Sequence, residues 1–162
     1  RREKYRLMWG AKALLIVMGI SFFMIRGRER AMSEKKIMVI DDEPAVHRLL
    51  QIILEVEGYR ITGLGSNEST RDSVTAGKPD LIILDIMMPE LNGFDVLRML
   101  KSDEETRDIP VVVLTACNRR QEREKALRLG AASYLTKPFQ PAELVKVIRS
   151  ALNTTCANRS AG

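Results

Sequence analysis

The sequence predicts an α/β fold with a doubly wound, five-stranded parallel sheet and helices on both faces, and two observations carry that prediction. From Lys36 onward, short apolar runs alternate with longer amphipathic stretches, which is the pattern of repeated βα units. Three of these runs are apolar throughout, as strands covered on both faces must be. The composition, 45% hydrophobic and 29% charged, is typical of a globular domain and excludes a disordered chain.

The apolar runs define five predicted strands. The second alternates polar and apolar residues, which favours a position at the edge of the sheet. In order, the strands are predicted at residues 37–41, 59–64, 80–85, 109–115 and 133–136.

A helix is predicted after each strand, because apolar residues recur there at helical spacing. The second helix is the weakest of these predictions, since its residues are mostly polar. Right-handed crossovers would place the carboxyl ends of all five strands at one rim of the sheet, where ligands bind in open α/β folds. The helices are predicted at residues 45–57, 68–75, 93–101, 119–129 and 141–152.

The formal net charge of +5 originates in residues 1–31, which hold eight basic and two acidic residues. The remaining chain is close to neutral, so the basic excess does not indicate a nucleic-acid-binding domain. Residues 13–25 are apolar without interruption, but a bilayer span needs about 20 residues. We interpret residues 1–31 either as a non-native or disordered leader, or as a membrane segment within residues 5–25. The folded domain is then expected at residues 32–153, with a short tail at 154–162.

Polar side chains follow the predicted strands at the common rim. Asp41 and Asp42 follow the first strand, Asp85 ends the third, Thr115 ends the fourth and Lys137 follows the fifth. Three carboxylates that come together repel one another unless a cation neutralises them. Oxygen ligands without His or Cys favour Mg²⁺. The sequence therefore predicts a magnesium site at this rim, with the Lys137 ammonium beside it.

Four motifs at these positions resemble, in order and spacing, those of response-regulator receiver domains of the CheY-like family. The resemblance covers Lys36 to about Leu152 and implies the flavodoxin-like strand order 2-1-3-4-5. The motifs are VIDDEP (39–44), LDIMMPELNG (84–93), LTA (114–116) and YLTKPF (134–139).

The resemblance implies an acceptor and a set of metal ligands. Asp85 would accept the phosphoryl group and also bind Mg²⁺. Asp42 would bind the metal directly, Asp41 would act largely through water, and the main-chain carbonyl of Met87 would be a further ligand. Each aspartate alone also has an ordinary interpretation as a helix cap or strand-end residue. Their convergence on one rim favours the functional interpretation.

The resemblance also implies the parts of a switch. Thr115 would bond a phosphoryl oxygen, Lys137 would pair with the phosphoryl group, and Tyr134 would swing inward when Thr115 moves. The Lys137-Pro138 peptide bond is expected to be cis. Met87 and Cys117 flank the pocket two residues after Asp85 and Thr115, and neither side chain orients an attacking water well. Slow self-dephosphorylation is therefore predicted.

Other classes of protein fit the residues less well. Met87 stands where a haloacid-dehalogenase-like phosphatase would carry an acid, and Asp41-Asp42 would repel a nucleotide phosphate. Gly63 and Gly65 lack the third glycine of a dinucleotide loop, so we predict turn residues there.

The predicted function is a phosphorylation-dependent signalling switch of a two-component or phosphorelay system, rather than an enzyme. His47, the sole histidine, lies in a helix without a kinase motif, so a separate sensor histidine kinase or phosphotransfer protein would supply the phosphoryl group. A downstream protein would dock on residues 119–152, with no direct contact to nucleic acid, since about ten residues follow the last predicted helix. We expect a cytoplasmic location, with membrane association only if residues 5–25 are an anchor. The alternatives are a membrane-tethered receiver or a receiver fragment of a longer hybrid kinase or regulator.

Overall fold

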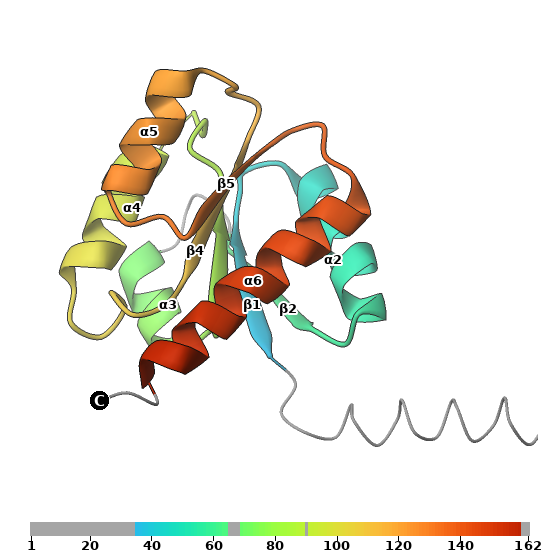
Figure 1. Ribbon diagram of the computed structural model, residues 1–162, viewed down its shortest axis with the longest axis horizontal. Helices are drawn as coiled ribbons and strands as arrows, with labels where there is room; N and C mark the ends of the chain where they lie inside the picture. Colours follow the sequence, from blue (N-terminus) through green and yellow to red (C-terminus); the bar gives the residue numbers. More distant parts are fainter. Residues whose placement is uncertain (1–34, 65–68, 90, 160–162) are drawn as a thin grey trace, which may run out of the picture. The chain divides into compact units, whose positions relative to one another are not determined.

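The computed structural model describes residues 35–64, 69–89 and 91–159, in which five strands and five helices alternate (Figure 1). The segment interpreted as a leader or anchor lies outside the described residues, as does Gly65. Within the described part of the chain, no helix is long and apolar enough to cross a membrane. The strands are β1 (Lys36–Ile40), β2 (Arg60–Leu64), β3 (Leu81–Leu84), β4 (Val111–Thr115) and β5 (Ser133–Thr136). The helices are α2 (Pro44–Val56), α3 (Thr70–Gly77), α4 (Gly93–Ser102), α5 (Arg120–Arg128) and α6 (Pro141–Arg159).

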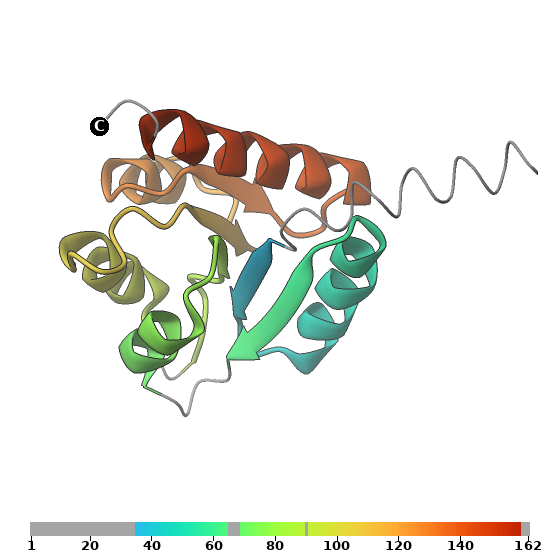
Figure 2. The same ribbon diagram turned by 90° about the horizontal axis from the view of Figure 1, so that it is seen from below.

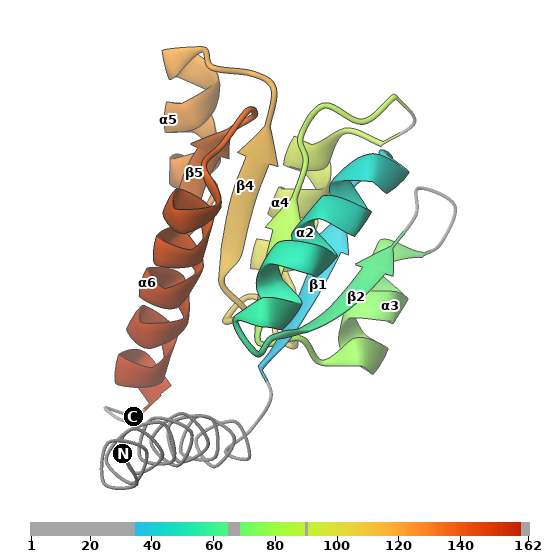
Figure 3. The same cartoon turned by 90° about the vertical axis from the view of Figure 1, so that its right-hand side faces the viewer.

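The strands form one parallel sheet in the order β2-β1-β3-β4-β5, which confirms the predicted topology. Figure 3 shows the strand arrows running in the same direction. All residues of β3 and β4 are buried, whereas in β2 only Leu64 is. The polar alternation of the second strand therefore reflects its place at the edge, as predicted.

Two layers of helices cover the two faces of the sheet. Helices α2 and α6 lie on one face, and α3, α4 and α5 lie on the other (Figures 1 and 2). On the first face, Leu50 and Leu144 pack with Val39 of β1. On the second, Leu97 packs with Ile82. Each of these side chains is fully buried and contributes about 1.5–3 kcal/mol relative to an exposed position.

Helices α3 and α6 are compared with the sequence-based predictions for them. Helix α3 buries only Val74, which agrees with its polar sequence. Helix α6 continues to Arg159, so its predicted end at residue 152 was wrong. No Gly or Pro follows Pro141 until Gly162, and the Thr154 hydroxyl donates to the Ser150 carbonyl at 3.0 Å, so nothing stops the helix earlier.

Gly63 is a strand residue rather than the predicted turn residue. It lies in β2 and pairs in register with Val39 of β1. The absence of a side chain at this position leaves room for the ring of His47, because a Cβ on Gly63 would lie 2.4 Å from its Nδ1. The glycine is therefore required by close packing and not by a turn.

Candidate functional site

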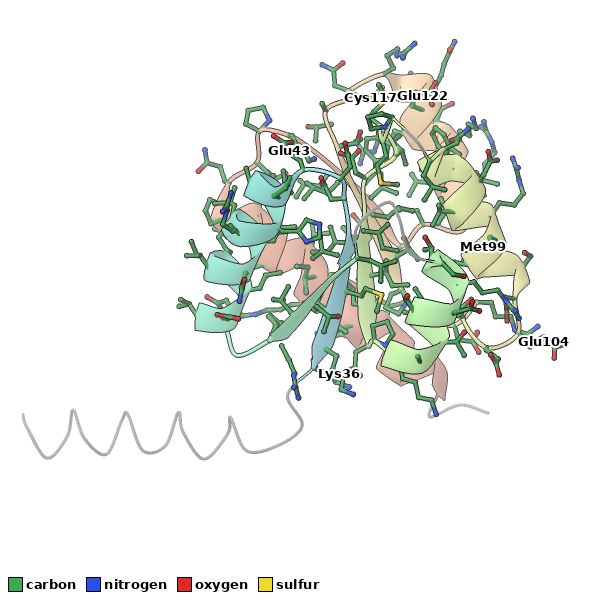
Figure 4. The ribbon with its side chains drawn as sticks, turned by 180° about the vertical axis from the view of Figure 1, so that it is seen from behind. Lys36, Glu43, Met99, Glu104, Cys117 and Glu122 are labelled. Atoms are coloured by element: carbon green, nitrogen blue, oxygen red, sulfur yellow. The ribbon has the colours of Figure 1, made fainter. Side chains whose placement is uncertain are left out.

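Four strand ends bring the predicted site residues to one rim of the sheet. The register pairs Ile40 with Leu84, so Asp41 and Asp85 follow neighbouring strands at the same level. The Lys137 amide donates to the Thr115 carbonyl at 2.8 Å, which places Lys137 beside the end of β4. In Figure 4 the labelled Glu43 and Cys117 lie at this rim, opposite the labelled Lys36. The Lys137-Pro138 bond is cis, as expected.

The Lys137 ammonium bridges two buried carboxylates at the centre of this rim. Its Nζ lies 2.8 Å from Asp41 Oδ2 and 2.7 Å from Asp85 Oδ2. Asp41 is 3% exposed and Asp85 is 6% exposed, so water screens these charges little. Short charge-assisted hydrogen bonds of this kind are the ones that stabilise buried charges.

The remaining oxygen of each carboxylate is held by the main chain. Asp41 Oδ1 accepts from the Glu43 amide at 2.9 Å, and Asp85 Oδ1 accepts from the Met87 amide at 2.8 Å. Both partners lie two residues after the aspartate, so each carboxylate is fixed by the turn that follows its strand. The two side chains are therefore held in place before any ligand arrives.

The cluster formed by Asp41, Asp85 and Lys137 holds one positive side chain and two carboxylates. Burial alone would lower the pKa of Lys137, but hydrogen bonds and charge attraction from Asp41 and Asp85 outweigh burial and raise its pKa above the usual lysine value. Lys137 is therefore charged at neutral pH. With both carboxylates ionised, the three groups carry one net negative charge, which a cation can neutralise.

The predicted metal ligands are only partly brought together. Asp41 and Asp85 are neighbours, whereas Asp42 is exposed at the rim. Among the described residues, no group of three or more His, Cys, Asp or Glu side chains is arranged to hold a metal ion. The Asp42 side chain is therefore not grouped with those of Asp41 and Asp85 in this conformation. The donor set still suits Mg²⁺, which takes one or two carboxylates and keeps several waters.

Thr115 and Tyr134 lie beside this cluster in buried positions. The Thr115 side chain is fully buried, and its hydroxyl oxygen accepts from the Cys117 amide at 3.4 Å. The Tyr134 hydroxyl donates to the Cys117 carbonyl at 2.6 Å, and Tyr134 is 7% exposed. Burial, together with the neighbouring Cys117 group, raises the pKa of Tyr134 to about 12. The structure thus describes the inward conformer of the tyrosine.

The roles of Asn92 and Gly93 at the start of α4 were not predicted from the sequence, although both residues lie in the LDIMMPELNG motif. A Cβ on Gly93 would lie 2.4 Å from the Asp85 carbonyl oxygen, so α4 begins in direct backbone contact with the strand end. Asn92 caps this helix, since its side chain accepts from the Phe94 amide at 3.0 Å. The Asn-Gly pair before an apolar helical run was the signal that could have indicated this start.

Comparison with known protein families and curated proteins gives consistent matches. Residues 37–149 match the response regulator receiver domain family. The phosphate regulon transcriptional regulatory protein PhoB of Pseudomonas aeruginosa is 37% identical over 121 residues, which cover 75% of this chain and 53% of that protein. The DNA-binding dual master transcriptional regulator RpaA of Synechocystis is 39% identical over 120 residues, covering 74% and 50%. The chain spans about half the length of these relatives.

Solved structures give the same match at the level of the fold. A putative response regulator from Chloroflexus aurantiacus superposes with a TM-score of 0.70 at 26% identity, over 75% of this chain and 99% of that one. The BeF3-activated N-terminal receiver domain of RstA from Klebsiella pneumoniae gives a TM-score of 0.67 at 28% identity, over 73% and 98%. Both structures are matched over nearly their whole length.

Proposed function

This chain belongs to the response regulator receiver domain family, and from that premise we propose that Asp85 is the residue that accepts the phosphoryl group. Family membership makes the chain a phosphorylation-based signalling module of the two-component type. The observation that carries the assignment is the buried Asp85 carboxylate at the strand edge, 2.7 Å from the Lys137 ammonium.

The proposed reaction is a displacement at phosphorus. An Asp85 carboxylate oxygen attacks the phosphorus atom of the donor, and a P–O bond forms while the bond to the leaving group breaks. The leaving group departs with the bonding electron pair, and Asp85 becomes an acyl phosphate. A carboxylate is a weak nucleophile, so catalysis depends on position and on neutralising the phosphoryl oxygens. The Lys137 ammonium lies at hydrogen-bond distance from Asp85 and would donate to one of those oxygens.

We assign the metal of this site as Mg²⁺, held directly by Asp42, Asp85 and the Met87 carbonyl, with Asp41 acting largely through water. The assignment is supported by the oxygen-only donors and by the net negative charge of the Asp41, Lys137 and Asp85 cluster. Asp42 is exposed at the rim, and its side chain would turn toward Asp85 to bind the ion. Bound there, the ion would neutralise negative charge on the phosphoryl oxygens.

The proposed output is a shift of Tyr134 and Thr115 that changes a protein-binding surface on residues 119–152. Since Tyr134 is buried with its hydroxyl on the Cys117 carbonyl, phosphorylation would stabilise this conformer over an outward one. The proposed donor is a sensor histidine kinase or phosphotransfer protein. It would reach Asp85 past the exposed Met87 and a neighbouring pocket of about 440 Å³.

A second candidate is a receiver domain, residues 32–153, within a longer hybrid kinase or regulator. It is favoured by one observation, that the chain covers about half of its curated relatives. One of those relatives, RpaA, is named as a DNA-binding regulator, and the proposed receiver itself makes no contact with nucleic acid. A cytoplasmic location is proposed because phosphoryl donors and Mg²⁺ are found there, with tethering through residues 5–25 as the alternative.

The test is incubation of the full chain with acetyl phosphate and Mg²⁺, followed by intact-mass measurement. We expect a mass increase of one phosphoryl group that requires Mg²⁺ and is lost in Asp85→Ala. Asp95→Ala is the matched control, since Asp95 is exposed on α4 and pairs only at the surface with Arg98. An adduct that persists in Asp85→Ala, or no adduct with the unmodified chain, contradicts the proposal.

A further inference from the structure

His47 is the sole histidine of the chain, and it makes a specific contact at the proposed site. It lies half-buried in the first turns of α2, and its Nε2 is 2.7 Å from the main-chain carbonyl oxygen of Asp41. A carbonyl oxygen can only accept a hydrogen bond, so Nε2 must carry the hydrogen. The contact therefore fixes both the orientation of the ring and its proton-bearing nitrogen.

The edge strand β2 holds the other side of the same ring. A Cβ on Gly63 would lie 2.4 Å from His47 Nδ1 and 2.8 Å from its Cε1, distances at which the ring would have to move. The ring therefore fills the space between α2 and the backbone of β2. It also lines a pocket of about 350 Å³ together with Asp41, Asp42 and Gly63.

Asp41 is held at three points, of which His47 supplies one. The Glu43 amide donates to Asp41 Oδ1 at 2.9 Å, and Lys137 donates to Oδ2 at 2.8 Å. Lys137 in turn bonds Asp85 Oδ2 at 2.7 Å. A continuous chain of contacts therefore runs from Gly63 and His47 through Asp41 and Lys137 to the proposed acceptor.

We infer that His47, seated on Gly63, is a positioning residue that fixes the backbone of Asp41 and so sets the carboxylate for Lys137 and Mg²⁺. This inference rests on the proposed function. Outer partners that orient a metal-binding carboxylate commonly change metal affinity or activity by about 10- to 100-fold when they are removed. Without the ring, the Asp41 carbonyl loses its donor and the turn after β1 gains freedom. The carboxylate then spends less time in the productive geometry.

Three variants of the full chain test whether His47 positions Asp41. His47→Leu removes the donor, Gly63→Ala displaces the ring, and His47→Gln keeps an N–H donor at a similar position. We expect the first two to raise the Mg²⁺ concentration needed for half-maximal phosphorylation by acetyl phosphate by about tenfold. His47→Gln should recover most of that loss. Gly77→Ala is the matched glycine control, because its new methyl group would meet only the flexible end of Met38.

A second readout does not depend on phosphorylation. Because there is one histidine, the imidazole region of a ¹⁵N NMR spectrum reports His47 alone. We expect the Nε2–H form in the unmodified chain and a shift of these signals on adding Mg²⁺ alone. In Gly63→Ala the signals should start at different positions and need more Mg²⁺ to shift. This measurement also serves if His47→Leu fails to fold.

The outcomes separate the two proposals. Absence of phosphorylation in the unmodified chain, with His47 signals that still respond to Mg²⁺, would overturn the proposed function and support the positioning role. An Nδ1–H form, or signals indifferent to Mg²⁺, would overturn the positioning role. Equal Mg²⁺ dependence in His47→Leu, His47→Gln and the unmodified chain would also overturn it.

Discussion

At the scale of single residues, Lys137 is the group on which the site depends most. It is the cation that both buried carboxylates, Asp41 and Asp85, contact directly. A buried charge without a partner is strongly unfavourable, so removing the ammonium leaves two aspartates in an environment that disfavours their ionised form. Lys137 therefore contributes to stability as well as to the proposed chemistry.

We expect Lys137→Met to lower the free energy of unfolding at neutral pH by about 3–5 kcal/mol, the typical effect of breaking a buried ion pair. The folded-state pKa of Lys137 is raised, so its contribution is complete below the usual lysine pKa of about 10.4 and is lost as the pH rises through the folded value. The difference in the free energy of unfolding between the unmodified chain and Lys137→Met should therefore become smaller above about pH 10.4. Urea unfolding across this pH range measures it.

Tyr134, whose pKa is raised to about 12, titrates in the same alkaline range. Because Tyr134 is present in both the unmodified chain and Lys137→Met, its titration contributes equally to both free energies of unfolding and does not affect their difference. A difference that stays constant through the alkaline range would contradict the role given to Lys137.

We propose that Met87 and Cys117 set the lifetime of the acyl phosphate on Asp85. Neither side chain orients water, so we expect Met87→Asn and Cys117→Glu to shorten the lifetime. Met87 is 57% exposed and tolerates the change, whereas Cys117 is 8% exposed, so a glutamate there must turn toward solvent. Decay of the phosphorylated protein, followed by intact mass, measures the lifetime. Leu127→Asn on the exposed side of α5 is the control, and an unchanged lifetime in both pocket variants would count against the idea.

At the scale of elements, helix α2 carries apolar side chains on its buried face and on its exposed face. Leu50 is fully buried against the sheet, whereas Ile52, two residues later, is 67% exposed. Leu49 and Val56 are also exposed, so an apolar stripe faces outward along the helix. The hydrophobic sequence of this helix therefore predicts its existence but overstates how much of it is core.

The difference in burial between Leu50 and Ile52 predicts that alanine substitutions at these two positions change stability by different amounts. We expect Leu50→Ala to lower the free energy of unfolding by about 2–5 kcal/mol, because it leaves a cavity in the core. Ile52→Ala should change it by less than about 0.5 kcal/mol. Denaturant unfolding of the two variants checks this expectation. Equal losses would mean that the outer face of α2 is covered in solution.

The start of α4 is the element most closely coupled to Asp85. A side chain at Gly93 would meet backbone atoms of Asp85 and Ile86, which cannot move aside as a flexible side chain does. We expect Gly93→Ala to lower the free energy of unfolding by about 1–3 kcal/mol, the usual effect of overpacking, and to slow phosphorylation by acetyl phosphate. Thermal unfolding and intact mass provide the two measurements. Gly77→Ala is the control, and unchanged phosphorylation in Gly93→Ala would show that this contact does not position Asp85.

At the scale of the whole molecule, the sequence predicted the sheet because its apolar runs report burial directly. The runs at β3 and β4 are covered on both faces, and the alternating run at β2 lies at the edge, as predicted. Residues after the strands meet at one rim as a consequence of parallel topology, so the convergence of Asp41, Asp85 and Lys137 also followed from sequence.

Other features depended on contacts that no local pattern encodes. The exposed position of Asp42 depends on the turn after β1, and the contacts of Lys137 with both Asp41 and Asp85 depend on the loop after β5. The strand position of Gly63 depends on the ring of His47, which comes from a different element. Such features follow from tertiary packing, which periodicity does not report.

The measurement that tests the central claim most directly is chemical identification of the phosphorylated residue. The protein is treated with acetyl phosphate and Mg²⁺, and the acyl phosphate is reduced with borohydride, which converts the modified aspartate to homoserine. Peptide mass mapping then locates the change. The account predicts homoserine at position 85 alone, and its appearance at Asp41 or Asp42 instead would contradict it.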